Sequence, residues 1–222
     1  MTVRPVDAVL FDCDGTLADS ASMIAANIVD ALRDIGHTVH AEQVRSVFGP
    51  PLPEMVRLLV GPVSEQQIER FNAAYGTYAA IRRPLIQPMP GAVALLDSLA
   101  ARRIPLAMVT NKGDAGAAAQ IAAFGWEGRF AAVVTQDTVA LPKPAPDPAL
   151  HALRLLGVAP ERAAFVGDTE SGAVCGRGAG IPLVISLRGA HDPMRLRAAG
   201  ATHVVETLGE VLTLLLGAGV SS

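Results

Sequence analysis

Cysteine is scarce in this sequence, and its placement excludes two common kinds of site. The 222 residues include only two cysteines, Cys13 and Cys175. Two cysteines cannot build a disulfide framework, and neither belongs to a C-x-x-C or Cys/His pattern typical of zinc sites. We therefore expect both thiols to be small buried side chains.

Long apolar runs and clusters of positive charge are missing as well. The most apolar uninterrupted stretch, 212–220, is far shorter than the roughly 20 residues of a membrane span. The N-terminus reaches Asp7 without the positive and apolar regions of a secretory signal. Neighbouring positive residues occur only in pairs such as Arg82-Arg83, and the net charge is −3. We expect a cytoplasmic protein with neither a membrane nor a nucleic-acid partner.

The chain does have ample apolar material in a regular order. Half of its residues are hydrophobic, which is enough to bury a sizeable core. Short continuous runs of Val, Ile and Leu alternate with helix-period segments, a pattern typical of parallel strands covered on both faces. We predict strands at 8–12, 104–110, 132–135, 163–166, 183–186 and 203–205, and helices at 92–102, 114–124, 146–156, 171–179, 193–198 and 208–216. This order predicts an α/β fold with a Rossmann-like parallel sheet.

A stretch after the first strand breaks this alternation. Residues 18–88 contain no convincing strand and instead predict helices at 22–35, 41–47, 53–59 and 65–82, separated by glycine and proline turns. We interpret 18–88 as a helical cap domain inserted into a core domain made of 1–17 and 89–222. The hinges are expected directly after Leu17 and in the proline-rich exit at 83–91.

The ends of the predicted strands carry residues suited to phosphate chemistry. Ligands of an open parallel sheet bind at the carboxyl ends of its strands, so these residues are expected to converge on one edge. They are Asp12, Asp14, Thr110, Asn111, Lys143 and Asp168. Lys143 is one of only two lysines and stands between two prolines that restrict its backbone.

These residue types predict phosphoryl transfer. The Asp12 carboxylate could attack phosphorus and split one hydrolysis into two easier steps. Asp14 would point to the same side of an extended backbone, where it could protonate the leaving oxygen and then deprotonate water. The Thr110 hydroxyl and the Asn111 amide would hold phosphoryl oxygens. Both aspartates could instead cap the turn at Gly15, but D-x-D-G-T directly after a predicted strand favours function.

Charge balance predicts a divalent metal ion at this edge. Three carboxylates and a phosphate dianion carry far more negative charge than Lys143 can offset. Mg²⁺ is the natural candidate, because all the available ligands are oxygen atoms.

The other charged residues are expected to be structural. Lys112 is predicted to face solvent at a helix start, and the histidines are predicted to be surface or packing residues. The cap arginines are expected to lie mostly on solvated helix faces, and one of them is a candidate for contacting substrate. The histidines are His37, His40, His151, His191 and His203, and the arginines are Arg45, Arg57, Arg82 and Arg83.

The order of the motifs resembles the haloacid dehalogenase (HAD) superfamily, and within it the phosphoglycolate phosphatase-like members with a helical, C1-type cap. Four motifs span nearly the whole chain: D-C-D-G-T, V-T-N-K, K-P-A-P and V-G-D-T. The resemblance implies Asp12 as nucleophile, Asp14 as general acid/base, and Thr110 and Lys143 on the phosphoryl group. It also implies Mg²⁺ held by the Asp12 carboxylate, the Asp14 backbone carbonyl and Asp168.

One departure from the family pattern concerns the metal. Relatives usually carry a second acid where this chain has Gly172, or a glutamate where it has Gly167. Glu170 is a weak substitute, because a two-residue offset at a helix start turns its side chain well away. We expect weaker Mg²⁺ binding than in relatives with both acids. The resemblance further implies that the turn at 49–51 in the cap selects the substrate.

The prediction is therefore a Mg²⁺-dependent phosphatase that hydrolyses a small phosphorylated metabolite, phosphoglycolate-like or a sugar phosphate, through an aspartyl-phosphate. Dehalogenases of the superfamily lack the acid at Asp14, phosphonate-cleaving relatives need a cap lysine that is absent here, and related mutases carry a glutamate at Gly167. The alternative is a catalytically weak or inactive member that binds a phosphorylated ligand or a partner, which the missing carboxylate suggests.

Overall fold

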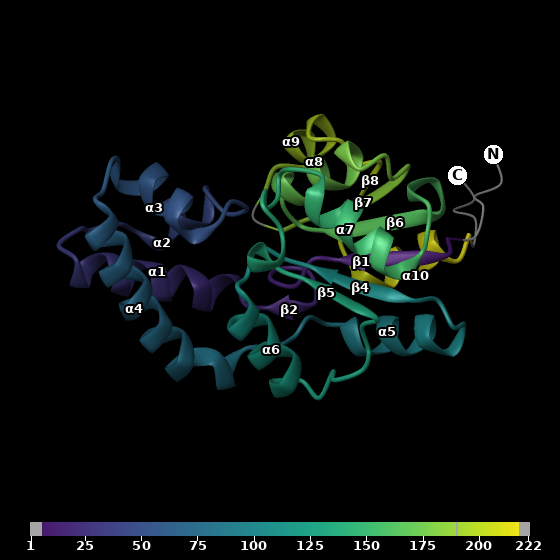
Figure 1. Ribbon diagram of the computed structural model, residues 1–222, viewed down its shortest axis with the longest axis horizontal. Coiled ribbons are helices and arrows are strands. Elements are labelled where there is room, and N and C mark those ends of the chain that lie inside the picture. The colour runs from purple at the N-terminus through teal and green to yellow at the C-terminus, as the bar shows by residue number, and fades with distance from the viewer. Residues whose placement is uncertain (1–5, 190, 218–222) are drawn as a thin grey trace.

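The computed structural model describes residues 6–189 and 191–217. Six parallel strands form one sheet in the order β5-β4-β1-β6-β7-β8, with helices on both faces (Figure 1). All six predicted strands are confirmed, with ends within two residues of those expected. They are β1 (Ala8–Phe11), β4 (Leu106–Val109), β5 (Ala132–Val134), β6 (Ala163–Gly167), β7 (Leu183–Leu187) and β8 (His203–Val205).

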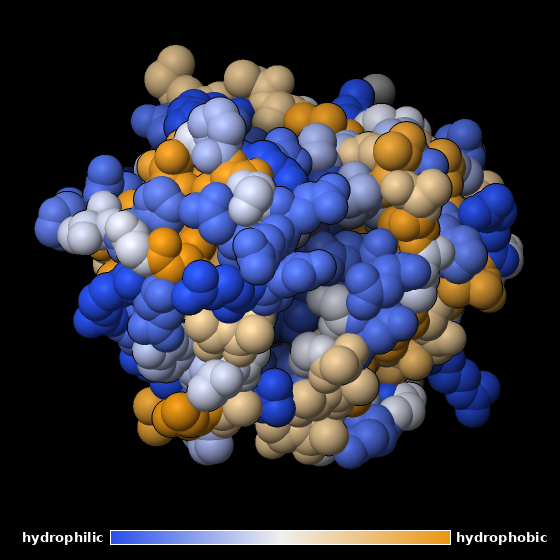
Figure 2. Space-filling view, turned by 60° about the vertical axis from the view of Figure 1, so that its left-hand side comes forward, coloured by the Kyte–Doolittle hydropathy of each residue, from blue (hydrophilic) through white to orange (hydrophobic). Residues whose placement is uncertain are grey.

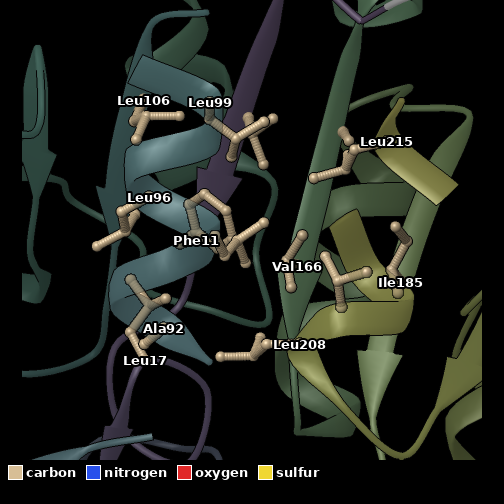
Figure 3. Close-up of a cluster of buried hydrophobic side chains, with 14 of the residues drawn as sticks. Phe11, Leu17, Ala92, Leu96, Leu99, Leu106, Val166, Ile185, Leu208 and Leu215 are labelled. Carbon is tan, nitrogen blue, oxygen red and sulfur yellow. The ribbon is translucent and has the colours of Figure 1, made fainter. Parts of the chain in front are cut away.

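The apolar runs are continuous because the central strands are covered on both faces. Side chains alternate along a strand, so Val9 and Phe11 of β1 pack on one face and Leu10 on the other. Helices α5 (Ala92–Ala101) and α10 (Leu208–Leu215) cover the first face. Figure 3 shows Phe11 between α5 and the side chains of β6 and α10. Its full burial stabilises the fold by about 2 kcal/mol.

The second face carries the remaining crossover helices. Leu10 and Phe165 pack there with Leu153 of α7 (Asp147–Leu156), Ala173 of α8 (Glu170–Gly178) and Leu196 of α9 (Pro193–Ala198). Helix α6 (Asp114–Ala123) joins β4 to β5 and packs beside the α5 face through Ile121. Both cysteines are free and buried, as predicted. Three 3₁₀ turns complete the core and its connections: η1 (Arg83–Leu85), η2 (Gln136–Thr138) and η3 (Pro160–Arg162).

The insert after β1 is helical, as predicted, and forms the cap at the left of Figure 1. Its helices are α1 (Ala21–Asp34), α2 (Ala41–Arg45), α3 (Leu52–Val60) and α4 (Glu65–Arg82). Ile28, Leu32, Val56 and Phe71 are fully buried in an apolar cluster of the cap's own. The cap therefore has a core separate from the two that flank the sheet.

A short antiparallel ribbon joins the cap to the core, and the sequence analysis missed it. Strands β2 (Ala18–Asp19) and β3 (Gln87–Pro88) pair across the entry and exit of the cap. The expectation of no strand within 18–88 was wrong, because two-residue strands carry no periodic signal and their pairing partner is distant in sequence. The predicted domain boundaries fall at this ribbon and remain a prediction.

Among the described residues, none of the helices combines the length and apolar character needed to cross a bilayer. Residues 218–220 of the apolar C-terminal run lie outside that part of the chain. In Figure 2, which turns the cap toward the viewer, hydrophilic side chains rim a hollow near the middle of the face.

Candidate active site

The six predicted site residues meet at the carboxyl ends of β1, β4 and β6. The strand order reverses at β1, because the chain continues from β1 through the cap to β4 on one side while β6 lies on the other. This reversal is where open α/β sheets bind ligands. A cavity of about 240 Å³ opens there between core and cap. Its lining includes all six predicted residues, Asp12, Asp14, Thr110, Asn111, Lys143 and Asp168.

Asp12 is a buried carboxylate held at both oxygens. The Cys13 backbone N–H donates to Oδ1 over 2.7 Å, and Lys143 Nζ lies 2.6 Å from Oδ2. The same ammonium donates to the Val109 carbonyl over 3.0 Å, and the Lys143 side chain is only 2% exposed. A buried charge is costly unless it is paired. The two charges therefore stabilise each other at the cavity wall.

Asp14 is also held by two donors, one of which the sequence analysis placed elsewhere. Ser20 Oγ donates to Oδ1 over 2.7 Å, and Lys112 Nζ lies 3.0 Å from Oδ2. The prediction that Lys112 faces solvent was wrong, because its side chain is 18% exposed and turns into the cavity. Burial by itself would lower the pKa of Lys112, but Asp14, together with the nearby Cys13 and Tyr75, outweighs burial and raises that pKa.

Thr110 and Asn111 play different parts after β4. The buried Thr110 hydroxyl accepts a hydrogen bond from the Lys112 backbone N–H over 3.1 Å. The Asn111 amide nitrogen donates to the carbonyls of Gly49 and Lys143, each over 2.8 Å, and its oxygen accepts from the Lys143 N–H over 3.0 Å. The expected contact of this amide with phosphate conflicts with these bonds. Asn111 instead ties the cap turn and the Lys143 loop to β4.

Asp168 is the second buried carboxylate of the site. Thr16 Oγ1 donates to it over 3.1 Å. Burial raises the pKa of Asp168 to about 7, and the nearby Asp12 carboxylate adds to the rise. Two buried carboxylates thus lie near each other, and among the described residues Lys143 is paired with Asp12 and not with Asp168. A divalent cation bound between them would offset this repulsion, and the oxygen donors are of the type that Mg²⁺ prefers.

The lack of a side chain at Gly15 leaves room for the Asp168 carboxylate. Gly15 has φ of +73°, and a Cβ at this position would collide with the Asp168 carboxylate. We expect Gly15→Ala to lower the free energy of unfolding by more than the 1–2 kcal/mol, roughly, that positive φ alone costs, and to reduce activity by displacing Asp168. Urea unfolding and phosphatase assays measure the two effects.

Gly36→Ala is the matched control for that substitution. Gly36 has φ of +92°, and a Cβ there would meet no heavy atom within 4 Å. This variant should show the backbone cost with full activity. Equal stability losses and full activity in both variants would contradict the role given to Gly15.

Glu170 does not replace the missing acid. Its carboxylate lies 2.8 Å from Arg195 Nε and 3.3 Å from His191 Nδ1, so it faces α9 rather than Asp168. His191 is buried, as a packing residue would be. Burial lowers the pKa of His191, although the nearby Glu170 carboxylate acts to raise it. Within residues 6–189 and 191–217, no three His, Cys, Asp or Glu side chains gather as metal ligands.

Two of the cap arginines, Arg82 and Arg83, have different surroundings. Arg82 was expected on a solvated face, but its guanidinium bonds the Asn27 side chain over 2.8 Å and pairs with Asp30. Arg83 lines the cavity, which makes it the cap arginine best placed to contact a substrate. Gly49 and Pro50 of the proposed selector turn also line the cavity.

Comparison with known proteins accounts for this arrangement. Residues 9–185 match the family model described as haloacid dehalogenase-like hydrolase. The chain belongs to this family. Among curated HAD relatives, "Probable phosphatase IndB" of Dickeya dadantii is 34% identical, with 92% of this chain and 91% of that protein covered. The phosphoglycolate phosphatase of Chromobacterium violaceum is 29% identical, with 97% and 99% covered.

A solved structure supports the same fold. A hydrolase from Pseudomonas syringae superposes with a TM-score of 0.87 at 25% identity, covering 95% of this chain and 98% of that one. The sheet order and the helical insert described above are therefore those of a HAD-like hydrolase with a cap. Family and relatives identify the chain as a HAD-like phosphatase, a phosphoric monoester hydrolase.

Three residues of the site, Ser20, Lys112 and Gln120, were not assigned to it from the sequence. Ser20 and Lys112 orient Asp14, and Gln120 of α6 lines the cavity although nothing near it in sequence marks it. The lysine in V-T-N-K carried a signal, because only two lysines occur and this one lies three residues after the end of β4. Ser20 and Gln120 belong to common residue types, and only their position in space shows that they face the site.

Proposed function

We propose that this HAD-like phosphatase hydrolyses a small phosphorylated metabolite, using Asp12 as nucleophile and Mg²⁺ as cofactor. The observation that carries the proposal is the buried Asp12 carboxylate, 2.6 Å from Lys143 Nζ, at the wall of the cavity between core and cap. A carboxylate fixed by two donors keeps one orientation toward an incoming phosphoryl group. The paired ammonium would also bind the phosphoryl oxygens.

The reaction would proceed in two steps. In the first, an Asp12 oxygen forms a bond to phosphorus, the bond from phosphorus to the leaving oxygen breaks, and Asp14 gives that oxygen a proton. In the second, Asp14 takes a proton from water as the water oxygen attacks phosphorus, and the bond to Asp12 breaks. Ser20 and Lys112 hold the Asp14 carboxylate in place. Thr110 and Lys143 would bind the phosphoryl oxygens throughout.

The metal would be held by two side chains and one backbone oxygen. The candidates are the carboxylates of Asp12 and Asp168 and the backbone carbonyl of Asp14. When bound, Mg²⁺ supplies positive charge that stabilises the transferring phosphoryl group. Thr16 and Gly15 serve the site by holding Asp168 and by leaving room for its carboxylate.

The size of the cavity beneath the cap favours a compact substrate. A cavity of about 240 Å³ is smaller than the roughly 300–1,000 Å³ typical of drug-sized ligands. The bond from Asn111 to the Gly49 carbonyl holds the cap turn against the core. We propose a phosphoglycolate-like or sugar phosphate substrate, which fits the space and the activity named for several relatives.

A simple assay tests the proposal. p-Nitrophenyl phosphate should be hydrolysed with Mg²⁺ and should not be hydrolysed after chelation with EDTA. Fluoroberyllate, which mimics a phosphoryl group on a carboxylate, should bind at Asp12 in a crystal soaked with Mg²⁺. A protein that binds phosphate but hydrolyses none of a panel of phosphomonoesters would instead be the inactive, ligand-binding relative.

Restoring the missing acid should strengthen metal binding. A Cβ at Gly172 would lie 3.2 Å from the Phe165 ring and 3.6 Å from Thr169 Oγ1, so a side chain fits after a small shift. We expect Gly172→Asp to bind Mg²⁺ about tenfold more tightly, the scale of second-shell effects on metal affinity. Calorimetric titration with Mg²⁺ measures this, with the uncharged Gly172→Asn as control. Equal affinities in all three proteins would reject the idea.

A further inference from the structure

Gln120 stands on the face of α6 that looks into the active-site cavity. Gly113, Gly116 and Gln120 all line this cavity, at spacings that place them on one side of the helix. A Cβ at Gly116 would lie 2.9 Å from Lys112 Cγ, so the glycine makes room for the lysine that reaches Asp14. One helical turn further on, Gln120 presents the next side chain to the cavity.

The side-chain nitrogen of Gln120 is buried and unpaired in the described part of the chain. The residue is 2% exposed, and its Nε2 atom has no hydrogen-bond partner among the described residues. A buried polar group left unpaired costs free energy, and such groups in native proteins call for an explanation. The fold gains nothing visible from an amide here, because an apolar side chain of similar volume would fill the space without that cost.

Two other amides that line this cavity, Asn27 and Asn111, have protein partners. Asn27 accepts from Arg82 over 2.8 Å, and Asn111 bonds Gly49 and Lys143. Lys112 is paired with Asp14. Gln120 thus differs from Asn27 and Asn111, because its side-chain nitrogen is unpaired among the described residues at a position that lines the cavity.

We infer that Gln120 determines specificity by donating a hydrogen bond to an oxygen of the substrate's leaving group. This rests on the proposed phosphatase function and extends it: the preferred phosphomonoester carries a hydroxyl or carboxylate oxygen beyond its ester bond. The phosphoryl end of the substrate is bound by Asp12, Thr110 and Lys143. Gln120 binds the leaving-group end, between α6 and the last turns of α4. The cavity is also lined by Tyr75, Ala79 and Arg83.

The test compares wild type and Gln120→Met on three probes. 2-Phosphoglycolate carries a carboxylate and glycerol 3-phosphate carries hydroxyls, whereas propyl phosphate has no oxygen beyond the ester. We expect Gln120→Met to reduce kcat/KM about tenfold or more for at least one oxygen-bearing probe and to leave propyl phosphate unchanged. The probe that loses activity identifies the carboxylate or the hydroxyl as the group recognised.

Stability separates this role from a structural one. Because Met keeps the volume and removes an unpaired amide, Gln120→Met should melt at the same temperature as wild type or higher. Gln66→Met, at an exposed position of α4, is the matched control and should behave as wild type on every probe. Equal losses on all three probes, no loss on any, or a lower melting temperature would overturn the inference. Failure of the wild type to hydrolyse any probe would overturn the proposed function itself.

Discussion

Asp12→Asn should abolish phosphatase activity, with kcat reduced by about 10⁴ or more, as for other catalytic nucleophiles. The asparagine amide is a poor nucleophile, so no covalent intermediate can form at this position. The fold should persist, because the asparagine oxygen can still accept from the Cys13 N–H that now bonds Asp12 Oδ1. Hydrolysis of p-nitrophenyl phosphate with Mg²⁺ measures the loss.

A matched control and a binding measurement complete this experiment. Asp97→Asn changes an aspartate whose side chain is 58% exposed and paired with Arg129, and surface pairs of this kind contribute little. It should keep wild-type activity. Fluoroberyllate should bind wild type and fail to bind Asp12→Asn. If Asp12→Asn retained a tenth of wild-type activity, another group would have to attack phosphorus. That result would contradict the proposed role of Asp12 as nucleophile.

Lys143→Met should destabilise the protein and remove most of its activity. The side chains of Lys143 and Asp12 are 2% and 8% exposed, so the substitution leaves a buried carboxylate without its ammonium. Breaking a buried ion pair in this way costs about 3–5 kcal/mol. Asp168 lies nearby and already has a raised pKa because of burial and Asp12, which adds to the unbalanced negative charge. Losing a charged phosphoryl contact should lower kcat by about 10³.

A double-variant cycle isolates the cause. In urea unfolding without Mg²⁺, Asp12→Asn/Lys143→Met should be more stable than Lys143→Met alone, because the uncompensated carboxylate is gone. Lys112→Met, at the other lysine, should cost less. Its partner Asp14 is 25% exposed and keeps the hydrogen bond from Ser20. Additive losses in the double variant would show that the two charges do not stabilise each other.

The sheet and the catalytic edge could be predicted because their signals are local. Continuous apolar runs mark the buried strands, and the residue after each run lies at the strand's carboxyl end whatever the rest of the fold does. Asp12, Thr110 and Asp168 were therefore assigned to one edge correctly. The ribbon of β2 and β3 could not be predicted, since two-residue strands leave no period and depend on a partner across the cap.

Side-chain partners could not be predicted in the same way. Lys112 and Glu170 both follow strand ends, yet one turns inward to Asp14 and the other outward to Arg195. Asn111 has a type suited to phosphate but bonds Gly49 of the cap instead. These directions depend on which segment packs opposite, and that segment is far away in the sequence.

The order of residues along the chain thus determined the fold class, the helical insert and the set of polar groups at one sheet edge. Tertiary structure alone decided how these groups pair, that Asp168 is buried beside Asp12, and that the unpaired amide of Gln120 faces the cavity. The reason is physical. Backbone periodicity follows from neighbouring residues, whereas the free energy of a buried polar group depends on the atoms that folding brings around it.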